Sequence, residues 1–135
     1  MSEPIVIHPE DVKHRVWPGG GEGRRMLEAV GSKKLLLSVV SADPGKSPHR
    51  WHKHTRDKGE GFEIIYPREF EEAYIIVRGK GTLYWKVGVE EKHAEVKEGD
   101  AVYFPFGVVE NQLVNSGDEQ LVIVAAGAPP VRVIK

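Results

Sequence analysis

The sequence predicts an all-β protein, a sandwich or barrel built from about ten short strands. Apolar or alternating runs rich in Val, Ile, Leu, Tyr and Phe recur along the 135 residues. Most runs are of about four to eight residues, the usual length of a strand. Glycines (15) and prolines (9) stand between many of them, where turns are needed. Helical periodicity is almost absent, so strands packed around one core are the expected architecture.

The predicted strands follow one another along the chain, separated by turn signals. The first, at 34–41 (KLLLSVVS), ends at Asp43-Pro44-Gly45, where proline fixes φ and glycine accepts a positive φ. The other strands are expected at 49–54, 62–66, 71–78, 82–87, 92–96, 101–104, 108–114, 120–126 and 131–134. Gly79-Lys80-Gly81 indicates a hairpin between two of them. The glycine-rich tract at 18–23 is expected to be a flexible loop.

Composition excludes several classes of function. The length suits one domain, 1–135, with its own core. A net charge of −1 gives no reason to expect a nucleic-acid or membrane-surface partner. Without cysteine there are no disulfides, thiolate zinc sites or cysteine nucleophiles. Neither a signal peptide nor a bilayer-spanning run is recognisable, so a cytoplasmic protein is expected.

The use of polar residues is also informative. The chain has two asparagines and two glutamines beside 29% charged residues, a pattern typical of hyperthermophile proteins, so we expect a thermophilic source. Both asparagines, Asn111 and Asn115, lie in one short segment. The pair Arg24 and Arg25 has the charge to meet an anionic ligand, although a solvated surface is the simpler expectation.

The strongest chemical signal is the segment 49–54, which holds three of the six histidines. Alternate residues of a strand face the same side, so His52 and His54 would present two imidazoles about 7 Å apart along the chain. Glu72 begins an apolar run that is expected to form a neighbouring strand. Two histidines and one carboxylate make a facial set of metal ligands with open positions, as in iron(II) centres. The sequence therefore predicts that His52, His54 and Glu72 bind a divalent metal ion.

Two segments resemble the motifs of the cupin superfamily, small jelly-roll barrels that bind a metal inside. Gly45, His52, His54, Glu72 and Gly79 match the first motif, with six residues between the glutamate and the last glycine. The second motif matches at 99–107 and in the turn that begins at Asn115. The resemblance covers about residues 34–126 and leaves 1–33 as an N-terminal arm. It implies a jelly-roll, or double-stranded β-helix, fold.

The second motif lacks its histidine, so the fourth ligand is open. Counting forward from Gly107 puts Glu110 at that position, and counting back from Asn115 puts Asn111 there. Asn111 is preferred because strand alternation would turn it inward with Leu113. His49 is a further alternative, although three places before His52 it faces the other side of a regular strand unless a bulge intervenes. Water could also fill the position.

The chain departs from the first motif by an insertion at 55–70. The family usually has three or four residues between the second histidine and the glutamate, whereas seventeen separate His54 from Glu72 here. A solvated loop or an added hairpin is the preferred interpretation. The alternative is a lid over the barrel mouth, with Asp57, Glu60 and Arg68 near the substrate.

The resemblance and the three ligands together imply a metal-dependent enzyme that acts on a small polar substrate, a sugar derivative or an organic acid. Isomerase, decarboxylase and dioxygenase chemistry all remain open, and the metal is Mn, Fe, Zn or Ni. The alternative function is a non-catalytic cupin that binds a small ligand with a degenerate metal site. Cupins commonly form dimers by exchanging N-terminal strands, so a homodimer is also implied, with 5–7 and 131–134 apolar enough to take part.

Overall fold

The computed structural model of the chain describes residues 3–54, 56–59, 61–108 and 110–134. The described residues form thirteen strands and two short 3₁₀ turns, Pro9–Asp11 and Glu28–Val30. The strands are β1 (His14–Val16), β2 (Glu22–Arg25), β3 (Leu36–Ala42), β4 (His49–His52), β5 (Arg56–Gly59), β6 (Phe62–Ile65), β7 (Glu71–Arg78), β8 (Lys80–Val87), β9 (Glu90–Lys97), β10 (Ala101–Phe104), β11 (Asn111–Asn115), β12 (Leu121–Ala128) and β13 (Arg132–Ile134).

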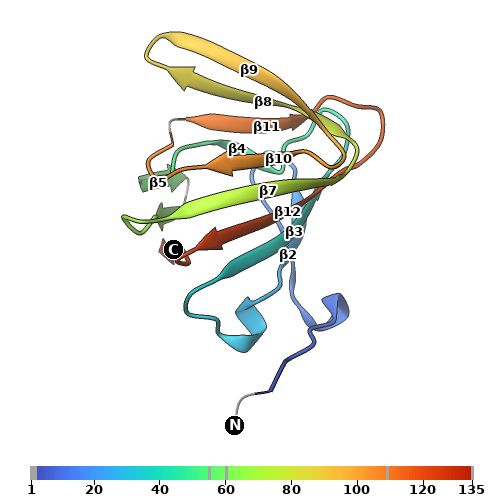
Figure 1. The fold of residues 1–135 in the computed structure, drawn as a ribbon, viewed down its shortest axis with the longest axis vertical. Helices are drawn as coiled ribbons and strands as arrows, with labels where there is room; N and C mark the ends of the chain where they lie inside the picture. Colours follow the sequence, from blue (N-terminus) through green and yellow to red (C-terminus); the bar gives the residue numbers. More distant parts are fainter. Residues whose placement is uncertain (1–2, 55, 60, 109, 135) are drawn as a thin grey trace.

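Two antiparallel sheets make up the body of the fold, and Figure 1 shows them one above the other. One sheet has six strands in the order β1-β2-β3-β12-β7-β10. The other has four strands in the order β4-β11-β8-β9. Strands that are distant in the sequence, such as β3 and β12, lie side by side within a sheet. This arrangement is the jelly-roll fold that the sequence predicted.

The hydrophobic core lies between the two sheets. Strand β7 illustrates its pattern, because Glu72, Tyr74 and Ile76 are buried while Ile75 and Val77 stand exposed on the other face. Period-2 alternation of this kind is what a half-buried strand requires. The core side chains come from both sheets: Val40, Tyr74, Ile76, Val96, Phe104, Leu113, Leu121, Ile123 and Ala125.

Truncating the core at Ile123 is expected to destabilise the protein strongly. Ile123 is fully buried, so Ile123→Ala removes buried methyl groups and leaves a cavity, at a cost of about 2–5 kcal/mol. Ile75→Ala is the matched control, because that side chain is 46% exposed on the adjacent strand and should cost clearly less. Urea denaturation of both variants measures the difference. Equal losses of stability in the two variants would contradict the placement of Ile123 in the core and of Ile75 on the outer face.

The predicted strands are present with small shifts at their ends, but the predicted hairpin at Gly79 is wrong. Strands β7 and β8 do not pair: β7 lies between β12 and β10, and β8 lies between β11 and β9. The chain therefore crosses from one sheet to the other at Gly79, which has φ +83. A Cβ there would come within 2.8 Å of the Gln120 carbonyl oxygen. The hairpin lies instead between β8 and β9, at Gly88.

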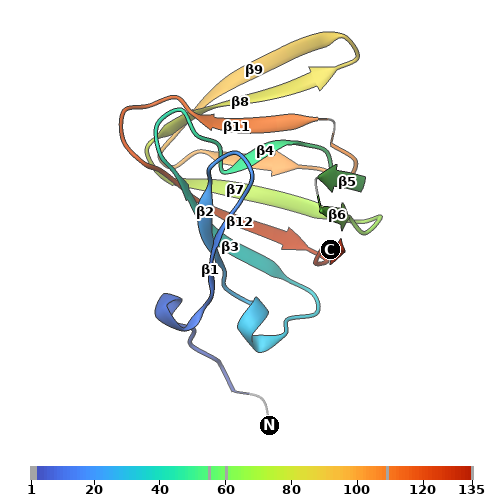
Figure 2. The same cartoon turned by 180° about the vertical axis from the view of Figure 1, so that it is seen from behind.

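The N-terminal arm is part of the sheet rather than an appendage. Strands β1 and β2 extend the six-stranded sheet at its β3 edge, as Figure 2 shows. The end of the glycine-rich tract, expected to be a flexible loop, begins strand β2, and Gly20 forms a bridge with Ser47. Ile5 and Val6 precede these strands and are mostly exposed.

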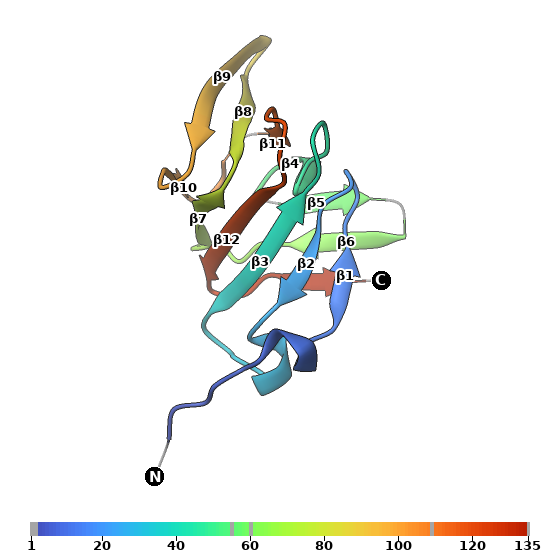
Figure 3. The same cartoon turned by 90° about the vertical axis from the view of Figure 1, so that its right-hand side faces the viewer.

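The insertion forms an added hairpin. Strands β5 and β6 pair with each other, and β13 at the C-terminus pairs with β6 to complete a three-stranded sheet (Figure 3). The preferred sequence interpretation of an added hairpin is confirmed. Glu60 and the side chain of Asp57 lie outside the described part, and Arg68 is exposed. Strand β13 lies within the segment 131–134 that was considered for a dimer contact, and here it pairs with β6 of its own chain.

Helices long and apolar enough to cross a membrane do not occur among the described residues.

Candidate metal centre

The candidate site lies where strand β4 runs along β11. Asn111 pairs with His52 but Leu113 pairs with His49, so β4 has one residue more than β11 over this stretch. That extra residue is a β-bulge, which re-aims the side chains on one side of it. The bulge turns His49 towards the interior, and its ring lies 5.5 Å from the ring of His52 and 5.8 Å from that of Tyr74.

Three side chains meet at short range inside the fold. The Nε2 atoms of His52 and His54 are 3.1 Å apart, and Nε2 of His54 is 3.5 Å from Oε1 of Glu72. Two ligand atoms that share an ion at about 2.1 Å lie about 3.0 Å apart at a right angle and about 3.4 Å apart at the tetrahedral angle. Both separations lie in this range, although 3.1 Å between the two ring nitrogens is equally the length of a hydrogen bond between them.

His52 is also oriented as a metal ligand usually is. Its Nδ1 lies 2.7 Å from the carbonyl oxygen of Arg50. A carbonyl only accepts, so Nδ1 carries the proton and donates, and in the neutral ring the lone pair is left on Nε2. A backbone carbonyl that holds the second ring nitrogen is the usual support of a metal-bound histidine.

His54 is held by aromatic packing. Its side chain is fully buried, and its ring stacks on Tyr66 at 5.0 Å and contacts Phe70 and Phe104. Tyr66 directly follows β6 of the insertion. The insertion therefore supplies one wall of the site through Tyr66, which also lines the neighbouring cavity.

Two imidazole nitrogens of the site lack a partner. Within the described residues, Nε2 of His49 and Nδ1 of His54 are buried with no hydrogen bond. A buried polar atom normally finds a partner, and an ion could supply one for Nε2 of His49. Nδ1 of His54 is directed away from Nε2 of the same ring, which faces His52 and Glu72, so an ion held between those residues would not reach Nδ1. Imidazole and carboxylate donors suit Mn, Fe, Zn and Ni alike, so the residues present fit a divalent transition metal.

The other candidate ligands lie differently. Asn111 is buried on the inward face of β11, as alternation predicted, and its Nδ2 donates to the carbonyl oxygen of His52 (3.2 Å). This contact ties β11 to β4 beside the histidines. Glu110 is exposed, and its carboxylate lies 3.6 Å from Nζ of Lys86. The structure brings His49, His52, His54 and Glu72 together, sets Asn111 beside them on the strand and leaves Glu110 outside.

The donors are not yet spaced as a complete site. Among the residues that the structure describes, no three or more His, Asp or Glu side chains are arranged so that they could hold a metal ion as they stand. The ligand roles of His52, His54, Glu72, Asn111 and His49 therefore remain predictions.

Burial sets the protonation of the site. The pKa of Glu72 is raised to about 8, because burial disfavours the charged carboxylate. The pKa values of His49 and His54 are lowered to about 3, first by burial and then by neighbouring positive charge. Near neutral pH the metal-free site therefore holds a protonated Glu72 and neutral imidazoles at His49 and His54.

The metal-free protein is expected to be most stable near pH 6.5, the ordinary pKa of histidine. As the pH falls below this value, the unfolded chain binds protons at His49 and His54 more readily than the folded chain, so acid removes stability. As the pH rises towards about 8, Glu72 stays protonated in the folded chain while it is ionised in the unfolded chain, so stability falls again.

Chemical denaturation with EDTA present, at several pH values on both sides of this maximum, measures the profile. Glu72→Gln should abolish the alkaline decline and leave the acid limb. A wild-type stability that rises steadily through pH 8 would contradict the prediction.

A cavity of about 90 Å³ opens beside the histidines. Its lining includes Trp17, Arg25, His49, His52, Tyr66 and Glu72, and we call it the histidine cavity. Sequence reasoning missed three of these residues: Trp17, which follows β1, Arg25 of β2, and Tyr66 of the insertion. The sequence signal for Arg25 was the positive charge of the pair Arg24-Arg25, which could meet an anionic ligand but was expected on a solvated surface.

Comparison with solved structures identifies the class of fold. A cupin 2 conserved barrel domain protein from Salinispora arenicola has a TM-score of 0.62 and 21% identity, over 94% of this chain and 89% of that one. The chain has the cupin fold, as its motifs suggested. No protein-family model matches the chain, and no curated protein sequence matches it.

Two further structures have names that state an activity. A predicted oxalate decarboxylase from Thermotoga maritima has a TM-score of 0.68 and 20% identity, over 93% of this chain and 100% of that one. A sugar phosphate isomerase from a cupin superfamily, from Silicibacter pomeroyi, has a TM-score of 0.69 and 18% identity, over 96% of this chain and 80% of that one. At such identities the likeness establishes the fold alone.

Proposed function

We propose that this chain is a metal-dependent cupin enzyme that acts on a small polar molecule. His52, His54 and Glu72 hold a divalent ion, Mn, Fe, Zn or Ni. His49 or Asn111 supplies a further donor, or water takes that position. The observation that carries this proposal is the contact of His52, His54 and Glu72 at ligand-like separations, with the second nitrogen of His52 held by a backbone carbonyl.

The arrangement supports chemistry at a carbonyl or carboxylate. A divalent ion held there polarises a carbonyl or carboxylate oxygen, and a redox-active one can also activate O₂. Tyr66 and Phe70 cover His54 and limit the entry of water. Glu72, protonated in the metal-free site at neutral pH, has to release its proton to become a ligand. Isomerisation, decarboxylation and oxygenation remain the candidate reactions.

Metal analysis of protein purified without a histidine tag tests the proposal first. We expect about one equivalent of divalent metal per chain, after purification or after reconstitution with Mn(II) or Fe(II) followed by desalting. Less than about a tenth of an equivalent in every preparation would remove the proposal.

Turnover then tests whether the metal centre is an enzyme. The loaded protein should act on one member of a panel of sugar phosphates, keto acids and oxalate, classes suggested by the names of the similar structures. Metal bound without turnover on the panel favours the second candidate described next.

The second candidate function is a non-catalytic cupin that binds a small ligand. It is favoured by the second motif, where Asn111 or Glu110 stands at the position of the expected histidine. A neutral amide is a weaker ligand than imidazole for late transition metals. Such a protein would bind small acids or sugars in the histidine cavity with equal affinity whether or not metal is present.

A homodimer, a cytoplasmic location and a thermophilic source stay part of the proposal. Exposed Val39, Ile75 and Val77 stand on the outer face of the six-stranded sheet and offer an apolar surface to a second copy. Sedimentation as a monomer at micromolar concentration would contradict the dimer.

A further inference from the structure

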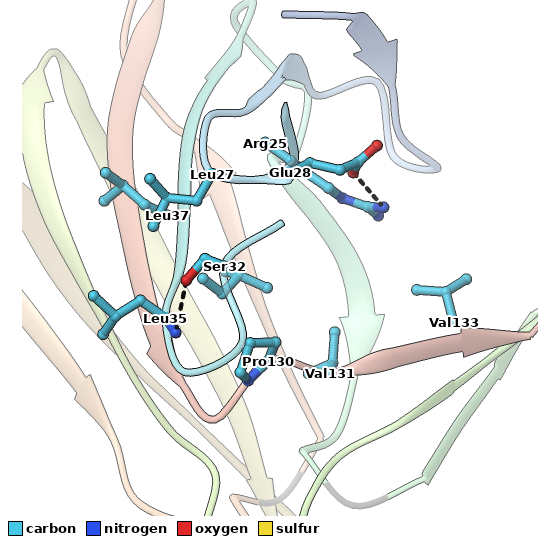
Figure 4. A pocket seen from close by; sticks show the side chains of 10 residues that line it. Arg25, Leu27, Glu28, Ser32, Leu35, Leu37, Pro130, Val131 and Val133 are labelled. Atoms are coloured by element: carbon cyan, nitrogen blue, oxygen red, sulfur yellow. Dashed lines mark hydrogen bonds and ion pairs between the residues drawn. The ribbon is translucent and has the colours of Figure 1, made fainter. Parts of the chain in front are cut away.

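A second hollow adjoins the histidine cavity. It is a groove of about 170 Å³, drawn in Figure 4, and its apolar lining includes Leu27, Leu35, Leu36, Leu37, Val131 and Val133. We call it the apolar groove. Four residues line both hollows: Arg25, Leu36, Val131 and Val133. The apolar groove and the histidine cavity are therefore neighbours that share one wall.

Arg25 stands at this shared wall. Arg25 is on strand β2. Alternate residues of a strand face the same side, so Arg25 shares its side of β2 with the buried Gly23. The guanidinium carbon lies 6.0 Å from the ring centre of Trp17, which in turn contacts the ring of His49 at 6.3 Å. The charge of Arg25 is close enough to contribute to the lowered pKa of His49. One end of the histidine cavity thus carries a cation near His49, one of the candidate ligands.

The positive charge at this point is only partly balanced. Glu28 lies 3.8 Å from Arg25, but the same carboxylate makes a closer ion pair with Arg15. Two guanidinium groups therefore share one carboxylate, and Glu28 is itself half exposed. The Arg25 side chain is only 30% exposed, so solvent screens its charge less than on an open surface. An excess of positive charge in a partly enclosed hollow attracts anions.

We infer that Arg25 selects an anionic substrate, a small carboxylate whose apolar chain lies in the apolar groove. The inference rests on the proposed function, because this substrate is the one that the metal site would act on. Arginine binds carboxylates through two parallel hydrogen bonds, so it fixes the orientation of the acid as well as its charge. The leucine and valine side chains of the groove then favour a hydrocarbon substituent over a second polar group.

None of the residues that carry this inference belongs to the two cupin-like motifs. Arg25 comes from the N-terminal strands, and Val131 and Val133 from the C-terminal strand and the residue before it. The proposed specificity therefore depends on segments that flank the barrel core together with the start of β3, which contributes Leu36 to both hollows.

Binding of 2-oxohexanoate to the full chain loaded with Mn(II) tests the inference by isothermal titration. We expect 2-oxohexanoate to bind at least about tenfold more tightly than pyruvate, because its longer chain reaches apolar surface. The uncharged 2-hexanone should bind more weakly than the acid. Arg25→Met should lower the affinity for 2-oxohexanoate at least about tenfold, since a charge-assisted hydrogen-bonded pair is lost. The affinity for 2-hexanone, which has no carboxylate, should stay unchanged.

Arg24→Met is the matched control. Arg24 is the preceding residue on the same strand, carries the same charge and lines neither hollow. The Arg24→Met variant should bind 2-oxohexanoate with an affinity within about twofold of the wild-type value, since the substitution leaves the charge at the shared wall intact. Arg25→Lys keeps the charge but loses the paired hydrogen bonds, and its affinity should fall between those of the wild type and Arg25→Met. This variant keeps the test available if Arg25→Met does not fold.

Metal content, measured on every variant, separates the two proposals. If metal is bound but Arg25→Met binds 2-oxohexanoate as the wild type does, the inference is overturned and the proposed function stands. Failure of the loaded wild type to bind any of the acids also overturns it. If the chain takes up no metal but still binds 2-oxohexanoate through Arg25, the proposed function fails and the anion site is upheld.

Discussion

Glu72→Gln is expected to abolish metal binding while leaving the fold intact. The substitution keeps the size and shape of the side chain but removes the only charged ligand among the three predicted ones. Changes in residues that merely support a ligand cost about 10–100-fold in metal affinity, so loss of a ligand should cost at least as much. The metal-free fold should tolerate the change, because burial already keeps Glu72 protonated near neutral pH.

Glu71→Gln provides the matched control. Glu71 is the preceding residue of β7, is exposed on the outer face of the strand and accepts a hydrogen bond from the hydroxyl of Tyr103. The same chemical change there should leave metal content unaltered. The measurement is metal per chain by elemental analysis, with circular dichroism and melting temperature recorded on both variants. Normal metal content in folded Glu72→Gln would refute the assignment of Glu72 as a ligand.

Gly23→Ala should lower the stability of the fold strongly. Gly23 pairs with Val40 across β2 and β3, and the two backbones approach closely there. A Cβ on Gly23 would lie 1.9 Å from the carbonyl oxygen of Val39 and 2.9 Å from the Cα of Val40. Both are backbone atoms of a central strand, so β2 has to move away. We expect the free energy of unfolding to fall by about 3 kcal/mol or more, which is at the upper end of the usual cost of an overpacked side chain.

Gly117→Ala is the control for this change. Its Cβ would meet the flexible side chain of Lys80 at 3.0 Å, which can move aside. Urea denaturation should show a near-normal midpoint for this variant and a large decrease for Gly23→Ala. If Gly23→Ala folds with β2 detached, Arg25 moves with the strand, and binding of carboxylates should weaken even where metal binding persists. A wild-type midpoint in Gly23→Ala would contradict the close approach of the strands.

Local sequence patterns predicted most of the architecture. Strand alternation requires only neighbouring residues, so β7 and β10 were predicted at their observed bounds and most other strands within a few residues. The same alternation correctly turned Glu72 inward with Tyr74 and Ile76, and Asn111 inward with Leu113. The inserted hairpin followed from the run at 62–66, which makes β6.

Predictions failed where the outcome depends on contacts between distant segments. Gly79 suggested a hairpin because glycine turns of this kind usually join paired strands. Here β7 pairs with β12 and β10, and this long-range pairing leaves β8 to the other sheet. The direction of His49 depends on a bulge that exists only in the pairing of β4 with β11. No local pattern in residues 49–54 predicts this bulge.

The amino-acid sequence by itself therefore determined that the chain forms short strands around a core, and that two imidazoles and a carboxylate face its inside. Both results follow from side-chain polarity and a period of two, which act within one strand. Only the tertiary structure decided that His49 joins the cluster, that Tyr66 covers it and that Arg25 enters the cavity wall. Those placements depend on strand register and on the packing of segments far apart in the chain, where many weak contacts compete and no single residue decides the outcome.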